Sequence, residues 1–99
     1  MINATAVNAI TSGENEKVKW WEKNGIVTVK LKENRTYVQN EVLATGLPPS
    51  ITGEDVRFIV YQQTSTGTRY LLIKPNGDLS ITANLTTAST TPYFGFYQC

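Results

Sequence analysis

The residues that could do chemistry in this 99-residue chain are mainly carboxylates, because it contains no histidine and a single cysteine, Cys99. Zinc sites built from the usual histidine and cysteine ligands therefore cannot form within the chain. Nucleophilic catalysis by a Ser-His-Asp or a Cys-His arrangement is excluded for the same reason. The remaining catalytic option is a pair of carboxylates that act as acid and base.

The eight acidic residues show no spacing that predicts such a pair. Glu54 and Asp55 are neighbours, and neighbouring side chains on an extended chain point in opposite directions. Asp78 follows Asn76-Gly77, where an acidic side chain commonly stabilises its own turn. We therefore expect a protein that is not an enzyme and needs no cofactor, and we keep a small glycan hydrolase as the least favoured alternative.

Composition and charge exclude other classes. The formal net charge is +1, so no strong electrostatic attraction to nucleic acid or to an anionic membrane is expected. No apolar run approaches the roughly 20 residues of a membrane-spanning helix. The first ten residues lack the basic region of a signal peptide. The length corresponds to one domain, and the share of Thr, Asn and Tyr is typical of a β-rich fold.

The elements that must position any binding residue are predicted to be short strands. Polar and apolar residues alternate in residues 17–23 and 26–32, and Asn24-Gly25 between them is a strong hairpin signal. Further strands are predicted at 41–45, 55–63, 69–74, 78–85 and 93–98. About seven short strands, and no helical period, predict an all-β fold: an antiparallel β-sandwich or a jelly-roll-like barrel.

The first sixteen residues differ from the rest because they show no clear period. We interpret residues 1–16 as an N-terminal arm or as a lead-in from an upstream stem. Residues 17–99 then form the sandwich domain.

The order of these segments resembles a known family. The segments are an aromatic strand at Trp20-Trp21, Lys23-Asn-Gly-Ile-Val-Thr-Val29, Val42-Leu-Ala-Thr-Gly-Leu-Pro-Pro-Ser50, Leu72-Ile-Lys-Pro-Asn-Gly-Asp-Leu-Ser-Ile81 and Tyr93-Phe-Gly-Phe-Tyr97. Over residues 17–99 this succession resembles the C-terminal head domains of bacteriophage tail-fibre, baseplate and receptor-binding proteins.

The resemblance implies a homotrimeric β-sandwich head at the tip of a virion's tail. It implies attachment to polysaccharide of the host cell wall or surface, and contact with upstream fibre or baseplate proteins. Nucleic acid and membrane insertion are not expected. The alternative is a structural domain of a phage tail or baseplate that serves assembly and binds no ligand.

A saccharide ligand would need exposed aromatic rings for the apolar faces of its sugars, and planar polar groups for its hydroxyls. Trp21 is the first candidate, because the alternation that buries Trp20 turns Trp21 outward among lysines. The alternative is that Trp21 packs on a neighbouring subunit, on the N-terminal arm or under the stems of Lys19 and Lys23.

A second candidate cluster lies around the predicted turn at residues 64–68. Tyr61 and Gln63 end one strand, and Arg69 and Tyr70 lie directly across from them if the turn is a hairpin. The alternative is ordinary cross-strand pairing on a solvated face.

The last strand supplies the third group. Tyr93 and Tyr97 share one face, and Phe94 and Phe96 share the other. We predict that the phenylalanine face belongs to the core and that the tyrosine face meets a neighbouring subunit or a ligand.

Overall fold

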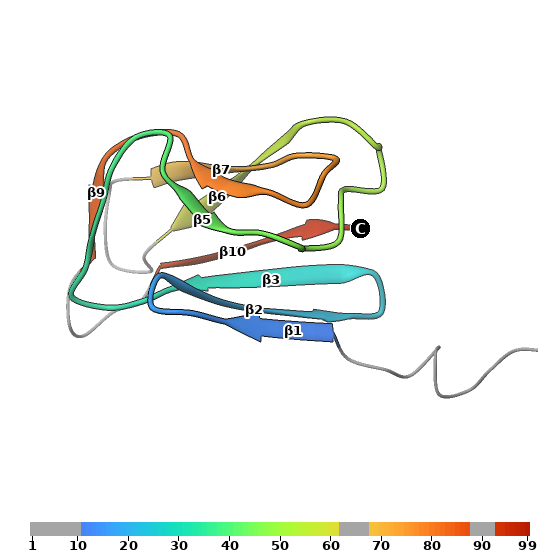
Figure 1. The fold of residues 1–99 in the computed structure, drawn as a ribbon, viewed down its shortest axis with the longest axis horizontal. Coiled ribbons are helices and arrows are strands. Elements are labelled where there is room, and N and C mark those ends of the chain that lie inside the picture. Colours follow the sequence, from blue (N-terminus) through green and yellow to red (C-terminus); the bar gives the residue numbers. More distant parts are fainter. Residues whose placement is uncertain (1–10, 62–67, 88–92) are drawn as a thin grey trace, which may run out of the picture.

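The computed structural model describes residues 11–61, 68–87 and 93–99, and within them the chain is all-β (Figure 1). The ten strands of these residues are β1 (Thr11–Glu14), β2 (Val18–Lys23), β3 (Ile26–Leu31), β4 (Thr36–Tyr37), β5 (Val42–Ala44), β6 (Val56–Tyr61), β7 (Thr68–Ile73), β8 (Leu79–Ile81), β9 (Leu85–Thr86) and β10 (Phe94–Gln98).

Eight strands form one antiparallel sheet in the order β1-β2-β3-β10-β6-β7-β8-β5. The sheet folds over at the junction of β10 and β6, which pair at Phe94 and Tyr61. Figure 1 shows the result: β1, β2 and β3 lie in one layer, β5, β6 and β7 lie in the other, and β10 runs between them. The predicted antiparallel β-sandwich is confirmed, and it is built from one continuous sheet.

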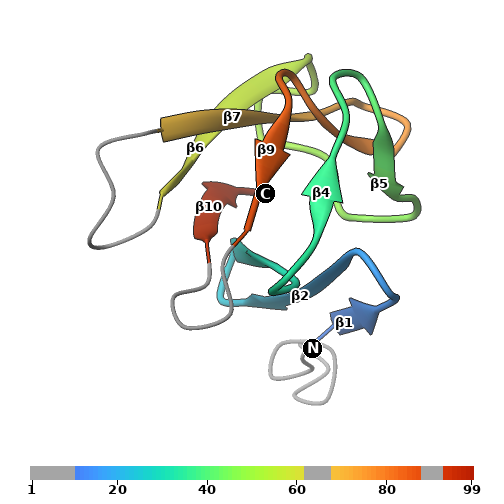
Figure 2. The same cartoon turned by 90° about the vertical axis from the view of Figure 1, so that its left-hand side faces the viewer.

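The ribbon of β4 and β9 is a separate two-stranded sheet. It crosses between the two layers at one end of the sandwich (Figure 2). The strand predicted at 78–85 is therefore two strands, because the chain leaves β8 after Ile81 and pairs again at Leu85 with Tyr37.

The β2–β3 hairpin follows directly from its turn residues. Asn24 and Gly25 have φ angles of 54° and 83°, so both central residues adopt the left-handed conformation of a two-residue hairpin turn. Lys23 pairs with Ile26 around this turn, and the Glu22 carboxylate accepts a hydrogen bond of 2.9 Å from the Gly25 amide. The predicted hairpin is confirmed.

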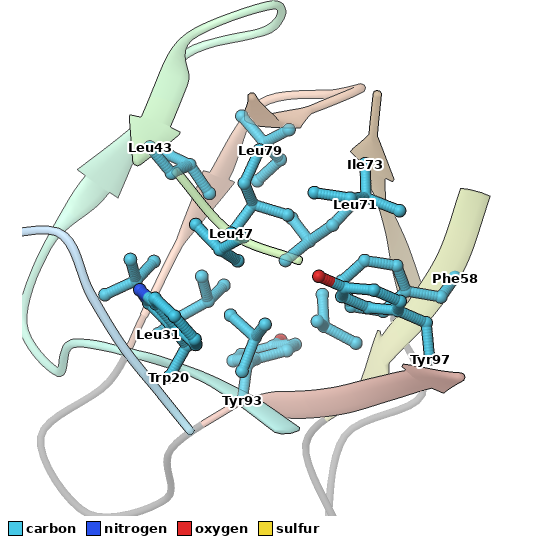
Figure 3. Close-up of a cluster of buried hydrophobic side chains, with 14 of the residues drawn as sticks. Trp20, Leu31, Leu43, Leu47, Phe58, Leu71, Ile73, Leu79, Tyr93 and Tyr97 are labelled. Atoms are coloured by element: carbon cyan, nitrogen blue, oxygen red, sulfur yellow. The ribbon is translucent and has the colours of Figure 1, made fainter. Parts of the chain in front are cut away.

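The core lies between the layers and is filled by alternate residues of the strands (Figure 3). In β2 and β3 the buried residues are the apolar members of the alternation noted in the sequence, Val18, Trp20, Val27, Val29 and Leu31. They meet the buried side chains of the opposite layer and of β4, which are Tyr37, Leu43, Leu47, Phe58, Val60, Leu71, Ile73, Leu79 and Ile81.

The two faces of β10 are the reverse of the prediction. Tyr93 and Tyr97 are core residues, exposing 6% and 5% of their surface. Phe96 is 58% exposed on the other face. The prediction that the phenylalanine face is core and the tyrosine face is free for a partner is wrong.

Pairing with β3 explains this reversal. Tyr97 lies opposite Val27 and Gly95 opposite Val29, so this face of β10 continues the buried face of β3. Phe96 lies opposite Thr28, whose side chain points away from the core. Because side chains alternate strictly along a strand, this register decides the direction of every side chain of β10.

The sheet also begins earlier than predicted. Thr11 to Glu14 pair with β2 from Glu22 to Lys19, so β1 is an edge strand upstream of the boundary expected at residue 17. Gly13 lies against the Trp20 indole, where an added Cβ would be 2.5 Å from the indole nitrogen. The remainder of the predicted arm, residues 1–10, lies outside the described residues.

Side-chain hydrogen bonds join the two ends of the eight-stranded sheet, where the β1–β2 turn meets β5. The Asn15 amide donates to the Leu43 carbonyl at 2.8 Å, and the Lys17 ammonium donates to the Val42 carbonyl at 3.1 Å. These bonds connect the β1–β2 turn to β5 and occupy carbonyls of an edge strand that could otherwise pair with another chain.

Candidate functional site

The candidate site is the solvent-facing side of the eight-stranded sheet, which we call the outer face. Its side chains alternate with the buried ones of the same strands. On the strands that matter to the site they are Ser12 and Glu14 of β1, Lys19, Trp21 and Lys23 of β2, Ile26, Thr28 and Lys30 of β3, Phe94, Phe96 and Gln98 of β10, Arg57 and Ile59 of β6, and Tyr70 and Leu72 of β7.

Strand pairing aligns some of these residues in rows. Trp21 lies opposite Thr28, and Thr28 lies opposite Phe96, so one row crosses three strands. In the other layer Ile59 lies opposite Tyr70. The β10 backbone passes against β6 at Gly95, where an added Cβ would overlap the Ile59 carbonyl oxygen. The two rows therefore meet where the sheet folds.

Around this junction the outer face carries four exposed apolar residues. Phe96 is 58% exposed, Ile59 and Tyr70 are each 45% exposed, and Ile26 is 39% exposed. We call these four residues the Phe96 patch. Single exposed apolar residues are common on protein surfaces, but a contiguous group marks a surface that contacts something.

On β2 and β3 the outer face is basic. The Lys19 ammonium lies 5.9 Å from the centre of the Trp21 ring, in cation–π range. We call Lys19, Trp21, Lys23 and Lys30 the lysine–tryptophan region. Trp21 is partly exposed there among lysines, so its predicted orientation is confirmed, and its binding role remains a prediction.

A carboxylate of β1 lies beside this region. Glu14 lies opposite Lys19 in the β1–β2 ladder and forms an ion pair with Lys32. The pKa of Glu14 is lowered, first by the hydrogen bond and charge of Lys32 and then by the charges of Lys19 and Lys30.

The residues of the cluster predicted around the β6–β7 turn do not lie together in the structure. Arg69 pairs with Val60, and Tyr70 pairs with Ile59. Adjacent residues of a strand point to opposite faces, so Arg69 does not share the outer face with Tyr70. Its Nε donates to the Asn84 carbonyl at 2.9 Å.

The remaining members of that cluster lie at the end of the described ladder. Tyr61 lies opposite Thr68 rather than opposite Arg69 or Tyr70. Gln63 lies outside the described residues. Of this cluster, Tyr70 is the residue that the structure places, exposed, on the outer face.

Tyr93 and Tyr97 are structural residues. The Tyr97 ring packs on Phe58 with centroids 5.0 Å apart, and its hydroxyl donates to the Pro48 carbonyl at 2.6 Å (Figure 3). Burial raises the pKa of Tyr97, and the charge of Cys99 adds to the shift. Neither tyrosine is available to a surface ligand.

Phe96 and Ile59 are exposed on the outer face instead, and neither was predicted as a site residue from the sequence. The sequence of β10 alone carries no signal for this, because both of its faces are aromatic. The alternation in β3 would have identified the exposed face once its pairing with β10 was known.

A second polar cluster, at the end of the sandwich, is structural. The Glu41 carboxylate lies 3.1 Å from the Lys17 ammonium and 3.6 Å from the Arg35 guanidinium, which lies over the Tyr37 ring. The Val38 amide donates to this carboxylate and, with the two cations, lowers the pKa of Glu41. Because Lys17 also bonds to β5, the cluster holds the two layers together.

The outer face offers a surface rather than a cleft. Among the described residues no pocket was found, and they contain no group of three or more His, Cys, Asp or Glu placed to hold a metal ion. None of the described segments is a helix with the length and apolarity needed to cross a membrane. Comparisons with known protein families, curated proteins and solved structures found no match to this chain.

Proposed function

We propose that this chain is the head domain of a bacteriophage or prophage tail protein that attaches to saccharide on the host cell surface without catalysis. The resemblance of residues 17–99 to tail-fibre, baseplate and receptor-binding heads supports the phage assignment. It also supports a homotrimer that is joined to upstream fibre or baseplate proteins and acts in the virion, outside the bacterial cell.

The observation that carries the binding role is the aromatic content of the outer face. Trp21, Phe96 and Tyr70 expose ring surface on three neighbouring parts of one sheet. Aromatic rings bind the apolar faces of sugars, and rings held on strands are positioned more rigidly than rings on loops. A surface of this kind suits a long polymer, which can lie across several strands.

A second candidate function is assembly without a ligand. It is favoured by the Phe96 patch, in which aliphatic Ile26 and Ile59 flank the exposed phenylalanine. Aliphatic groups contribute little to the binding of sugar hydroxyls, whereas apolar centres with polar rims are typical of protein interfaces.

Binding to purified bacterial cell walls and to a glycan array tests the two candidates. We expect Trp21→Ala and Tyr70→Ala each to weaken wall binding by about tenfold, a loss of about 1.4 kcal/mol. Val38→Ser is the matched control, because Val38 is 59% exposed outside the outer face. Full wall binding by both variants would contradict the adhesion role.

Light scattering of the same proteins tests the assembly role. If the outer face serves assembly, Phe96→Ser and Ile59→Ser reduce the oligomer to a monomer while Val38→Ser does not. A wild-type chain that is monomeric at micromolar concentration would count against the homotrimer.

A further inference from the structure

We infer that the saccharide recognised by the outer face is an anionic polysaccharide, with a negative charge in its repeating unit, held by Lys19, Lys23 and Lys30 around Trp21. This inference rests on the proposed adhesion function and specifies the chemistry of its ligand.

The first observation is that the outer face of β2 and β3 carries one sign of charge, although Glu14 of the adjoining strand β1 lies opposite Lys19 on the same face. Lys19, Lys23 and Lys30 point outward from these two strands, and no acidic side chain does. Glu22, the acidic residue of β2, lies opposite buried Val27 on the other face. With a chain net charge of only +1, this concentration of lysines comes from their positions and not from the overall composition.

The second observation is a cross-strand pair of like charges. Lys19 lies directly opposite Lys30 in the β2–β3 ladder. Like charges in this position destabilise a sheet. Glu14 opposite Lys19 and Glu33 beside Lys30 offset part of this repulsion, and a bound anionic group would relieve the remainder.

The acidic residues nearby cancel only part of this charge. Lys32 pairs with Glu14, and Lys30 lies 3.6 Å from Glu33. Lys19, Lys23, Lys30 and Lys32 against Glu14 and Glu33 leave a net charge of +2 on this part of the molecule. The pKa of Glu14 is lowered mainly by its hydrogen bond and ion pair with Lys32, and to a smaller extent by the charges of Lys19 and Lys30.

The third observation is the place of the tryptophan within this charge. Trp21 lies two residues from Lys19 and two from Lys23, so the Cα atoms of the two lysines lie about 7 Å on either side of the Trp21 Cα along the strand. The Lys19 ammonium itself lies 5.9 Å from the centre of the ring. A sugar that packs on the indole would place charged substituents of its neighbours near the two ammonium groups. A neutral polysaccharide could pack on the Trp21 ring but would form no ion pairs with the lysines.

Affinity electrophoresis and calorimetry with defined polymers test the inference on the full chain. The probes are alginate as an anionic polysaccharide and dextran as a neutral one. We expect alginate to bind at least about tenfold more tightly than dextran, and its affinity to fall as salt rises from about 50 mM to about 200 mM, because the ion pairs are screened.

Two variants separate charge from stacking. Lys19→Gln combined with Lys23→Gln should weaken alginate binding by about tenfold, and Lys74→Gln, an exposed lysine at the β7–β8 turn, should leave it unchanged. Trp21→Ala should weaken binding to alginate and to dextran alike. Urea unfolding midpoints equal to that of the wild type show that the variants are folded.

The outcomes distinguish this inference from the proposed function. Equal binding of dextran and alginate, with no effect of the lysine variants, overturns the anionic ligand and leaves adhesion standing. Binding to neither alginate, dextran nor cell walls overturns the adhesion function itself. Binding to polyglutamate or to poly(dT) as tight as to alginate overturns the saccharide, because charge alone or a nucleic acid would then explain the site.

Discussion

The two faces of β10 are both aromatic, but one is buried and the other is exposed. Tyr93 and Tyr97, the more polar aromatic residues, are buried. Phe96, the more hydrophobic, is exposed to solvent, and Phe94 shares its face. Hydrophobicity alone would give the opposite arrangement.

Two features of the buried face explain the difference. Gly95 lies between the tyrosines, and its lack of a side chain lets β10 approach the Ile59 carbonyl where the sheet folds. Tyr97 fills the space beside Phe58 and satisfies its hydroxyl at the Pro48 carbonyl. A phenylalanine there would leave that carbonyl without this donor. Contacts with the neighbouring strands therefore decide which face of β10 is buried. An apolar residue that this arrangement leaves exposed, such as Phe96, is a candidate for function.

The strongest test of this comparison is truncation on each face. We expect Tyr97→Ala to lower the free energy of unfolding by about 3–5 kcal/mol, because a buried aromatic ring leaves a cavity. Phe96→Ala, the same type of truncation one residue away, should cost less than about 1 kcal/mol. Urea titration monitored by tryptophan fluorescence measures both. Equal costs would mean that the assignment of the faces is wrong.

A second test concerns the close approach at Gly95. Gly95→Ala should destabilise the protein by about 1–3 kcal/mol, since the added methyl group meets a backbone carbonyl that cannot rotate away. Gln98→Ala on the outer face is the control and should change stability by no more than about 0.5 kcal/mol. A neutral Gly95→Ala would show that β10 and β6 are not held so closely.

Removal of the buried Tyr97 hydroxyl should have a smaller effect on the free energy of unfolding, and this effect should depend on pH. Tyr97→Phe should cost about 1 kcal/mol near neutral pH, because one hydrogen bond is lost. Burial raises the pKa of Tyr97 in the folded state, so its contribution is fully present below about pH 10 and is lost as the pH rises toward the raised value.

The variant should therefore lose less stability than the wild type as the pH rises from about pH 10 to about pH 12. Urea midpoints across this range provide the measurement. Parallel profiles for the two proteins would mean that Tyr97 ionises as freely when folded as when unfolded.

The smallest expected effect is on the exposed face. Phe96→Thr replaces an exposed ring with a residue that also favours strands, so stability should change by no more than about 0.5 kcal/mol. Its effect should be seen in association or wall binding instead. A large loss of stability in a monomeric protein would show that Phe96 is not a functional surface residue.

Local features of the sequence were sufficient for the elements that depend on local physics. Asn24-Gly25 predicts its hairpin because few residues adopt positive φ at two successive positions. The alternation in β2 and β3 predicts Val18, Trp20 and Val27 in the core, and it predicts that Trp21 points outward. The candidate residues around the β6–β7 turn were less predictable. Arg69 and Tyr70 are neighbours in the sequence, but on β7 they lie on opposite faces of the sheet and do not form one site.

The sequence by itself determined the class of this protein: short amphipathic strands, separated by turn residues, that can bury their apolar faces only by packing two layers together. The absence of histidine likewise removed whole classes of chemistry. Only the tertiary structure decided that β10 lies between β3 and β6, that β1 extends the sheet and that the phenylalanines face outward. The physical reason is that strand register is a long-range property: pairing between residues distant in sequence orients every side chain of a strand, and a strand with two aromatic faces carries no local preference.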